Sequence, residues 1–257
     1  MTSPLRARSV LREHLVSSRI AGDVGTSRES NLAAMRRLAA GDPSTWFGLP
    51  PTAEHSFADV LGIMVARVGV DPDPSHVEGA DTIDPERTLD RLAAMRERLE
   101  RAARDRARVF VATGHPAGVI AIHLRIAQAL RRHGCELAAP DAGRWWERNG
   151  TRRQLRYLDG VAVLSEHGAL HHSHASEPMA DLLADGLSVD LVVADHGWAG
   201  AAAAAGLDVV CFADCNDPAL VVGEATGAVA VTVPLDDNVL PHLYDPVADH
   251  LLAGLGG

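Results

Sequence analysis

Histidine and aspartate residues recur in this sequence at points where predicted strands end. His172 and His174 are two residues apart, so both imidazoles lie on one side of the chain if the segment is extended. Two imidazoles presented in this way are a recurrent means of binding one cation. Asp195 and His196 follow a buried strand, where an unpaired carboxylate is costly unless it binds a metal ion. We therefore predict a divalent ion (Mg²⁺, Mn²⁺ or Zn²⁺) bound by His172, His174, Asp195 and His196.

A second group of polar residues is suited to holding phosphate and moving protons. Thr113, Gly114 and His115 lie between a predicted strand and a helix that begins at Pro116, and the free N–H groups of a helix N-terminus favour an anion. We predict that Thr113 and Gly114 bind phosphate oxygens and that His115 is catalytic. Asp214 follows a further strand and is predicted to orient or deprotonate the nucleophile.

Several polar residues could have a purely structural role in place of a functional one. Arg28 could reach a phosphate from the helical part of the chain, or it could be an ordinary surface arginine. Asp217 precedes Pro218 just as Asp84 precedes Pro85, so the cap of a helix is the leading interpretation for Asp217. The segment 236–238 is a vaguer candidate. The histidine pair could also be a solvated loop, and Asp195 could also cap the following helix.

The composition excludes several chemistries. All 24 basic residues are arginine and none is lysine, which rules out Schiff-base lysine enzymes and the lysine of P-loop or kinase sites. The net charge of −10 argues against a nucleic-acid partner. No G-x-S-x-G, G-x-G-x-x-G or H-E-x-x-H motif occurs in a suitable context. Asp71-Pro-Asp-Pro-Ser75 superficially resembles an aspartyl-phosphate motif, but it follows a predicted helix end and contains two prolines.

The location of the protein follows from its cysteines and its apolar segments. Three cysteines, an odd and small number, are typical of a reducing compartment. The N-terminus lacks an uninterrupted apolar segment, and no stretch of the sequence is typical of a membrane span. We expect a cytoplasmic protein with no membrane partner and leave open whether it forms a homodimer.

Two patterns of hydrophobic residues divide the chain. Residues 1–106 show helical periodicity in several segments separated by proline-containing loops. From residue 107 onward, short β-branched runs such as 109–113, 190–195 and 208–214 alternate with helical segments. This alternation predicts an α/β, Rossmann-like fold with a mainly parallel, doubly wound sheet at 107–257 and a helical region or cap at 1–106. Asp159-Gly160 predicts a hairpin within it.

Four segments at these strand ends carry a resemblance to a known family: ATGHPAG, ADHGWAG, FADCNDPAL and VPLDDNV. With them the chain resembles a family of actinobacterial proteins labelled as phosphatases, and the resemblance extends along most of the sequence, including GTSRESNL and DTIDPERT in the helical part. The resemblance implies phosphomonoester hydrolysis in the cytoplasm. It does not assign a substrate or catalytic residues.

The sequence as a whole favours an enzyme, a phosphoric monoester hydrolase that acts on a small phosphorylated metabolite with the help of a metal ion. One alternative is a sugar-phosphate isomerase or another phosphosugar-binding enzyme, which needs the same anion site but no metal. A second alternative is a non-catalytic metabolite-binding protein, which would bind its ligand without turnover.

Overall fold

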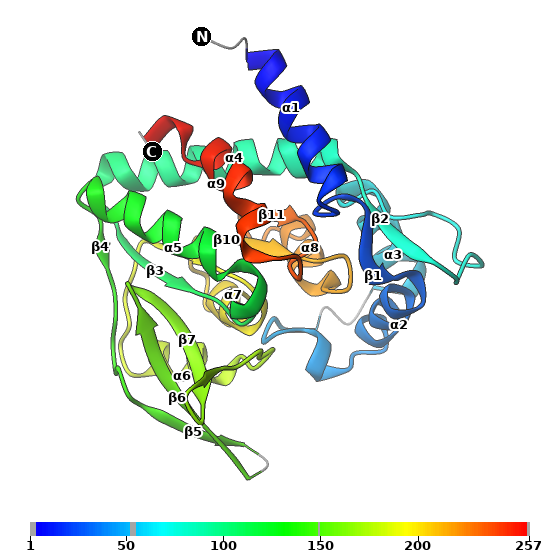
Figure 1. The fold of residues 1–257 in the computed structure, drawn as a ribbon. Coiled ribbons are helices and arrows are strands. Elements are labelled where there is room, and N and C mark those ends of the chain that lie inside the picture. The colour runs from blue at the N-terminus through cyan, green and yellow to red at the C-terminus, as the bar shows by residue number, and fades with distance from the viewer. Residues whose placement is uncertain (1–3, 52–54, 149, 256–257) are drawn as a thin grey trace.

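The computed structural model describes residues 4–51, 55–148 and 150–255. It contains a central sheet whose strands follow the order β11-β10-β9-β3-β7-β6-β5 (Figure 1). The five strands at one end of this order are parallel: β3 (Arg108–Ala112), β7 (Val161–Glu166), β9 (Leu191–Ala194), β10 (Val209–Ala213) and β11 (Val231–Pro234). These strands consist almost entirely of buried apolar residues, as expected when helices cover both faces. The predicted α/β class and mainly parallel sheet are confirmed.

The parallel strands are extended on one side by an antiparallel ribbon. β6 (Thr151–Leu158) pairs with β7 and with β5 (Trp145–Arg148), while the short strands β4 (Glu136–Leu137) and β8 (Ala169–Leu170) pair with β3 and β7. The β6–β7 hairpin turns at Asp159-Gly160, where both residues have positive φ, as the dipeptide predicts.

Helices cover the two faces of the sheet in two groups (Figure 1). One group contains α4 (Pro85–Asp105), which packs on β11, and α5 (Pro116–Arg132), which packs on β3 and β7, together with α1 (Pro4–Ser17) and α9 (Asp245–Leu251). The other contains α6 (Glu177–Ala184), α7 (His196–Ala204) and α8 (Pro218–Ala225). α2 (Arg28–Ala39) and α3 (Phe57–Arg67) pack against α8.

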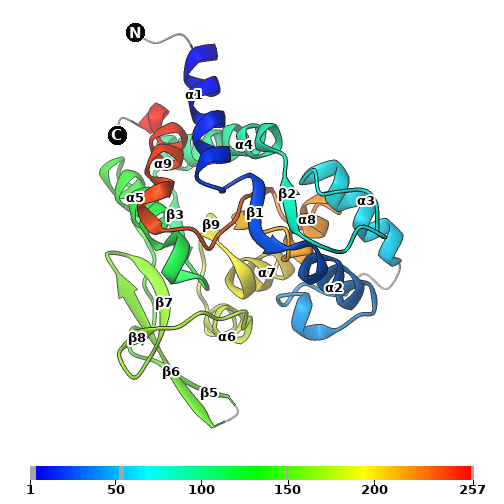
Figure 2. The ribbon, with the colours of Figure 1, turned by 45° about the vertical axis from the view of Figure 1, so that its right-hand side comes forward.

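The N-terminal part is not purely helical, which corrects the prediction from periodicity. β1 (Gly22–Ser27) and β2 (Ala80–Ile83) form an antiparallel pair beside α2 (Figure 2). Their sequences, GDVGTS and ADTI, have too few apolar residues for a strand signal. A hydrophobic cluster joins residues of both parts of the chain, among them Met95 and Val231. The division into two regions at residue 106 therefore remains a prediction.

None of the helices within the described residues has the length and apolar character that crossing a membrane requires.

Candidate metal and active site

The polar segments predicted from the sequence meet at one edge of the sheet. Four segments follow the carboxyl ends of parallel strands: His115 comes after β3, His196 after β9, Asp217 after β10 and Asp237 after β11, whereas His172 and His174 follow the short antiparallel strand β8. β3 and β9 are neighbours, but the chain continues from β3 to β7 on one side and from β9 to β10 on the other. Such a reversal leaves a crevice beyond the strand ends, where ligands of open α/β sheets bind.

Four imidazole rings form the centre of this site. His115 stacks on His172 with ring centroids 4.2 Å apart, and the centroids of His174 and His196 are 4.4 Å apart. The Nε2 atoms of His172 and His174 are 3.0 Å apart, within hydrogen-bond distance, and the tautomers of the two rings decide which nitrogen would donate. We name His115, His172, His174 and His196 the imidazole cluster.

Two buried carboxylates, those of Asp217 and Asp237, lie next to the rings of His196 and His115. Asp217 Oδ2 lies 2.9 Å from His196 Nε2, and Asp237 Oδ2 lies 3.3 Å from the same nitrogen. Asp237 Oδ1 is 3.0 Å from His115 Nδ1. His196 itself has φ of +44°, which is uncommon for a non-glycine residue and is a form of backbone strain found at functional sites.

The imidazoles have different protonation behaviour in the metal-free protein. Burial and the charges of neighbouring histidines lower the pKa of His172 to about 4 and that of His174 to about 3, so both rings are neutral at pH 7. Burial alone would lower the pKa of His196 and of His115. Asp217 and Asp237 outweigh this effect for His196, and Asp237 does so for His115, so both pKa values are raised. The same two histidines lower the pKa of Asp237, against the effect of its burial.

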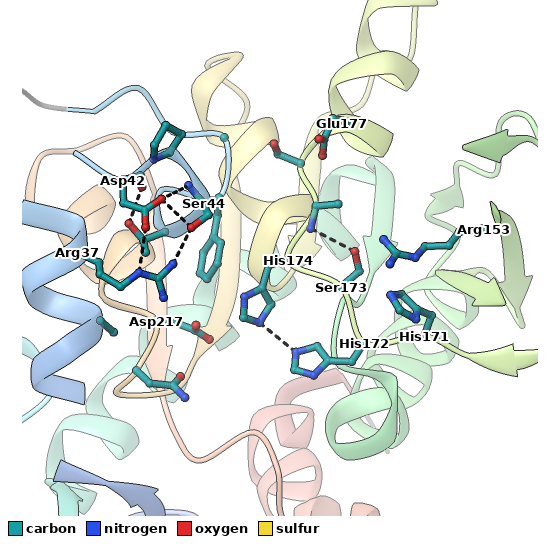
Figure 3. A pocket seen from close by; sticks show the side chains of 18 of the residues that line it. Arg37, Asp42, Ser44, Arg153, His171, His172, Ser173, His174, Glu177 and Asp217 are labelled. Carbon is teal, nitrogen blue, oxygen red and sulfur yellow. Dashed lines mark hydrogen bonds and ion pairs between the residues drawn. The ribbon is translucent and has the colours of Figure 1, made fainter. Parts of the chain in front are cut away.

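A cleft of about 950 Å³ opens on the imidazole cluster (Figure 3). His172, His174 and Asp217 line it, with Arg37 and Asp42 from the α2 side and Arg153 from β6. Candidate metal-ligand atoms thus lie in the wall of a cleft that a small molecule could enter.

Comparison with known proteins identifies the family. Residues 6–256 match the model of a family described as Phosphatase. The chain belongs to this family. It is 48% identical over 258 residues to a protein of Streptomyces coelicolor named Phosphatase SCO2771, with 97% of each chain covered. No solved structure matches the chain.

In this member of the Phosphatase family, Asp195 directly precedes His196 in the chain and is not part of the imidazole cluster. Its Oδ2 accepts a hydrogen bond from Thr113 Oγ1 and its Oδ1 accepts one from Gly114 N–H, each at 2.5 Å. The carboxylate is fully buried, 3.5 Å from His196 Nδ1 and 3.8 Å from His123 Nε2. Both oxygens of Asp195 thus accept hydrogen bonds from the β3 loop, and no hydrogen bond joins Asp195 to His196 Nδ1, so its role as a metal ligand stays a prediction.

This geometry changes the predicted phosphate site. Thr113 Oγ1 and Gly114 N–H donate hydrogen bonds to Asp195, and Thr113 is buried, so we do not assign these two residues as phosphate ligands. Arg28 is 0% exposed, and its guanidinium donates to Asp81 Oδ2 and to the carbonyls of His76, Asp71 and Asp73. With no exposed surface, Arg28 supports the N-terminal part and is not placed to contact a ligand.

Asp214 also has internal partners in place of the predicted catalytic contact. Its carboxyl oxygens accept hydrogen bonds from Thr26 Oγ1 at 2.5 Å and from Cys215 N–H at 2.6 Å. Burial, followed by the charges of Asp237 and Asp236, raises the pKa of Asp214 well above its ordinary value. Asp214 thus joins β1 to the loop that follows β10, and we assign it no step in the reaction.

Two residues of the site were not selected by sequence reasoning. Asp217 was interpreted as a cap because of the following proline, but its side chain makes no capping hydrogen bond to α8. Asp84, with the same Asp-Pro sequence, does cap α4 by accepting from Glu86 N–H at 2.9 Å. Asp237 belonged only to the vaguer segment 236–238. No local signal separates Asp217 from Asp84, because the difference lies in the distant His196.

Glycines of the family segments allow the loops of the site to approach each other. A Cβ at Gly118 would lie 1.8 Å from the carbonyl oxygen of Asp237, and one at Gly114 would lie 2.3 Å from that of Ser173. A Cβ at Gly197 would lie 2.2 Å from the carbonyl oxygen of Ala175. Backbone contacts this close leave no room for a side chain.

We expect Gly118→Ala to displace Asp237, because a methyl group cannot fit against its carbonyl. The predicted loss is about 1–3 kcal/mol of unfolding free energy and roughly 10–100-fold in phosphate release, the usual effect of disturbing the supports of a metal ligand. Gly62→Ala in α3 is the control, since no atom lies within 4 Å of its Cβ position. The unfolding free energy of the Gly62→Ala protein should rise by about 0.5–1 kcal/mol, and its activity should be unchanged. Thermal unfolding measures the stability of both variants, and a phosphate-release assay measures their activity. Equal stability and activity of Gly118→Ala and Gly62→Ala would contradict the prediction.

Proposed function

We propose that this protein is a metal-assisted phosphatase that hydrolyses a small phosphorylated metabolite. The observation that carries the proposal is the convergence of the imidazole cluster with Asp217 and Asp237 at an open cleft, in a chain of the Phosphatase family. Its relative in S. coelicolor is named a phosphatase over nearly the same length, which supports the same activity here.

The residues fit a divalent ion. Ligand atoms of His174, His196 and Asp217 all lie within 4.8 Å of one another, and so do those of His115, His172 and His196. His196 Nδ1 is buried and forms no hydrogen bond with the described part of the chain. Because imidazole nitrogen dominates this donor set, Zn²⁺ and Mn²⁺ suit it better than Mg²⁺. We assign His172, His174, His196 and Asp217 as the ligands.

Each group of the site then has a defined task. A bound ion would polarise the phosphoryl group and lower the pKa of a water molecule. Asp237, 3.3 Å from His196 Nε2, helps to orient this ring, and His196 Nδ1, which forms no hydrogen bond with the described residues, is available to the ion. Asp237, 3.0 Å from His115 Nδ1, raises the pKa of His115, which favours its protonated form, so we assign His115 to donate a proton to the leaving oxygen.

The experiment is a phosphatase screen with purified protein stripped by a chelator and then supplied with Mg²⁺, Mn²⁺, Zn²⁺ or no metal. We expect phosphate release from phosphomonoesters only with a divalent ion. Tight binding of phosphosugars by the stripped protein would favour the isomerase alternative. Binding without turnover across a broad panel would favour a metabolite-binding protein.

The proposed cytoplasmic location has support from the cysteines. Cys135, Cys211 and Cys215 are all buried and unpaired, as is usual in a reducing compartment.

Binding of the metal should release protons and strengthen as pH rises. The raised pKa of His196 means that its imidazole is a cation in the metal-free protein, and a metal binds only the neutral ring. His172 and His174 contribute no protons near pH 7, because their pKa values are about 4 and 3. Calorimetric titration with Zn²⁺ at pH 7, in buffers of different ionisation enthalpy, should show about one proton released per ion. Affinity independent of pH between 6 and 8, with no proton release, would contradict the assignment.

A further inference from the structure

Among the described residues that line the cleft, Arg153 is a cationic group without a carboxylate closer than 3.8 Å. It lies on β6 and lines the cleft beside His171. Its Nε is buried and forms no hydrogen bond with the described residues, and the nearest carboxylate atom, Glu166 Oε2, is 3.8 Å away. Glu166 is also 3.3 Å from His171 Nδ1, so it is shared between two basic groups. The charge of Arg153 is therefore poorly compensated within the protein.

Arg37, on the other side of the cleft, differs from Arg153 in this respect. Its Nε is 2.9 Å from Asp42 Oδ2, and its Nη2 donates to Ser44 Oγ at 2.7 Å. Figure 3 shows Arg37 and Arg153 on opposite sides of the cleft, with His172 and His174 between them. The cleft thus has one arginine, Arg37, that is hydrogen-bonded to Asp42 and Ser44, and another, Arg153, that has only a 3.8 Å contact with Glu166.

The size of the cleft indicates a substrate with a sizeable leaving group. Its volume of about 950 Å³ is near the upper end of the roughly 300–1,000 Å³ of small-molecule sites, far more than one phosphate needs. Arg153 comes from the wall formed by the antiparallel ribbon, whereas the metal-ligand candidates come from the strand-end loops and the segment after β8. An anionic group on the leaving part of the substrate would meet Arg153 while the scissile phosphate lies at the imidazole cluster.

We propose that Arg153 forms a second anion subsite that binds a second phosphate group on the substrate, which makes the preferred substrates bisphosphates. A guanidinium presents several N–H donors to phosphate oxygens in a fixed geometry. The proposal rests on the proposed function, because it assumes that the scissile phosphate lies at the imidazole cluster.

The test compares a hexose bisphosphate with the corresponding hexose monophosphate in the metal-loaded enzyme. Wild type should show a kcat/KM for the bisphosphate at least about 10-fold higher, the effect of a charge-assisted hydrogen bond or two. Arg153→Gln should remove this preference while changing kcat/KM for the monophosphate less than about 3-fold. The matched control is Arg152→Gln on the same strand, an exposed arginine stacked over Trp145 at 4.8 Å, which should keep the preference.

Several results would overturn the subsite. One is a wild type without preference for the bisphosphate, and another is Arg153→Gln with an unchanged preference. An equal loss on both substrates would place Arg153 at the scissile phosphate instead. Thermal unfolding checks that each variant is folded. If no substrate releases phosphate, the proposed function fails separately, and calorimetric binding of the same two compounds decides the subsite: wild type should bind the bisphosphate more tightly and Arg153→Gln should not.

Discussion

His174→Ala is expected to reduce phosphate release by roughly 1,000-fold or more, a larger effect than the ~10–100-fold typical of groups that only support a ligand. The Nε2 of His174 is 3.0 Å from that of His172, and its ring lies 4.4 Å from the ring of His196. Loss of this nitrogen removes one of the proposed ligands, so the metal content of the purified variant should fall together with its activity. Elemental analysis and a phosphate-release assay measure both quantities.

The control for this substitution is His133→Ala. The His133 Nδ1 lies 3.0 Å from the carbonyl oxygen of Ala129 within the same helix, outside the imidazole cluster. We expect wild-type metal content and activity from it. A His174→Ala protein that keeps its metal and turns over at the wild-type rate would remove His174 from the ligand set.

Asp217→Ala should lower activity and Asp84→Ala should lower stability, although both aspartates precede a proline at the start of a helix. Asp217 pairs with His196 and makes no capping bond, so its loss should lower phosphate release by roughly 1,000-fold and weaken metal binding, as for a lost ligand. Asp84 caps α4, so its loss should cost about 1 kcal/mol of unfolding free energy and leave activity within about 2-fold of wild type.

Chemical denaturation and the same activity assay compare the two aspartate variants. If Asp84→Ala loses activity as severely as Asp217→Ala, the loss at residue 217 reflects general damage to the fold. If Asp217→Ala retains activity, Asp217 is removed from the proposed ligand set.

Strand-end positions explain why much of the site could be predicted from sequence. Runs such as LVVA and VVCFA are apolar at every position, which indicates strands covered on both faces. Because parallel strands end at a common edge, the residues that follow them were expected to meet there, and the structure brings His115, His172, His174 and His196 together.

The roles of individual residues within the site depend on partners that local sequence does not contain. Thr113 and Gly114 follow a strand and precede a helix, as phosphate-binding residues often do, but Asp195 occupies their donors. Arg28 has the sequence context of a surface residue, yet it is paired with Asp81, 53 positions away, and buried. Arg153 belongs to no recognisable sequence motif, and it becomes a candidate anion-binding residue only because β6 runs beside the cleft.

The central claim is that His172, His174, His196 and Asp217 bind a divalent ion. The most direct measurement is anomalous X-ray scattering at the manganese absorption edge from a crystal of the protein saturated with Mn²⁺. The account predicts a strong anomalous peak within coordination distance of His172, His174, His196 and Asp217. A structure of protein that releases phosphate, with no peak among these four side chains at saturating Mn²⁺, would contradict it.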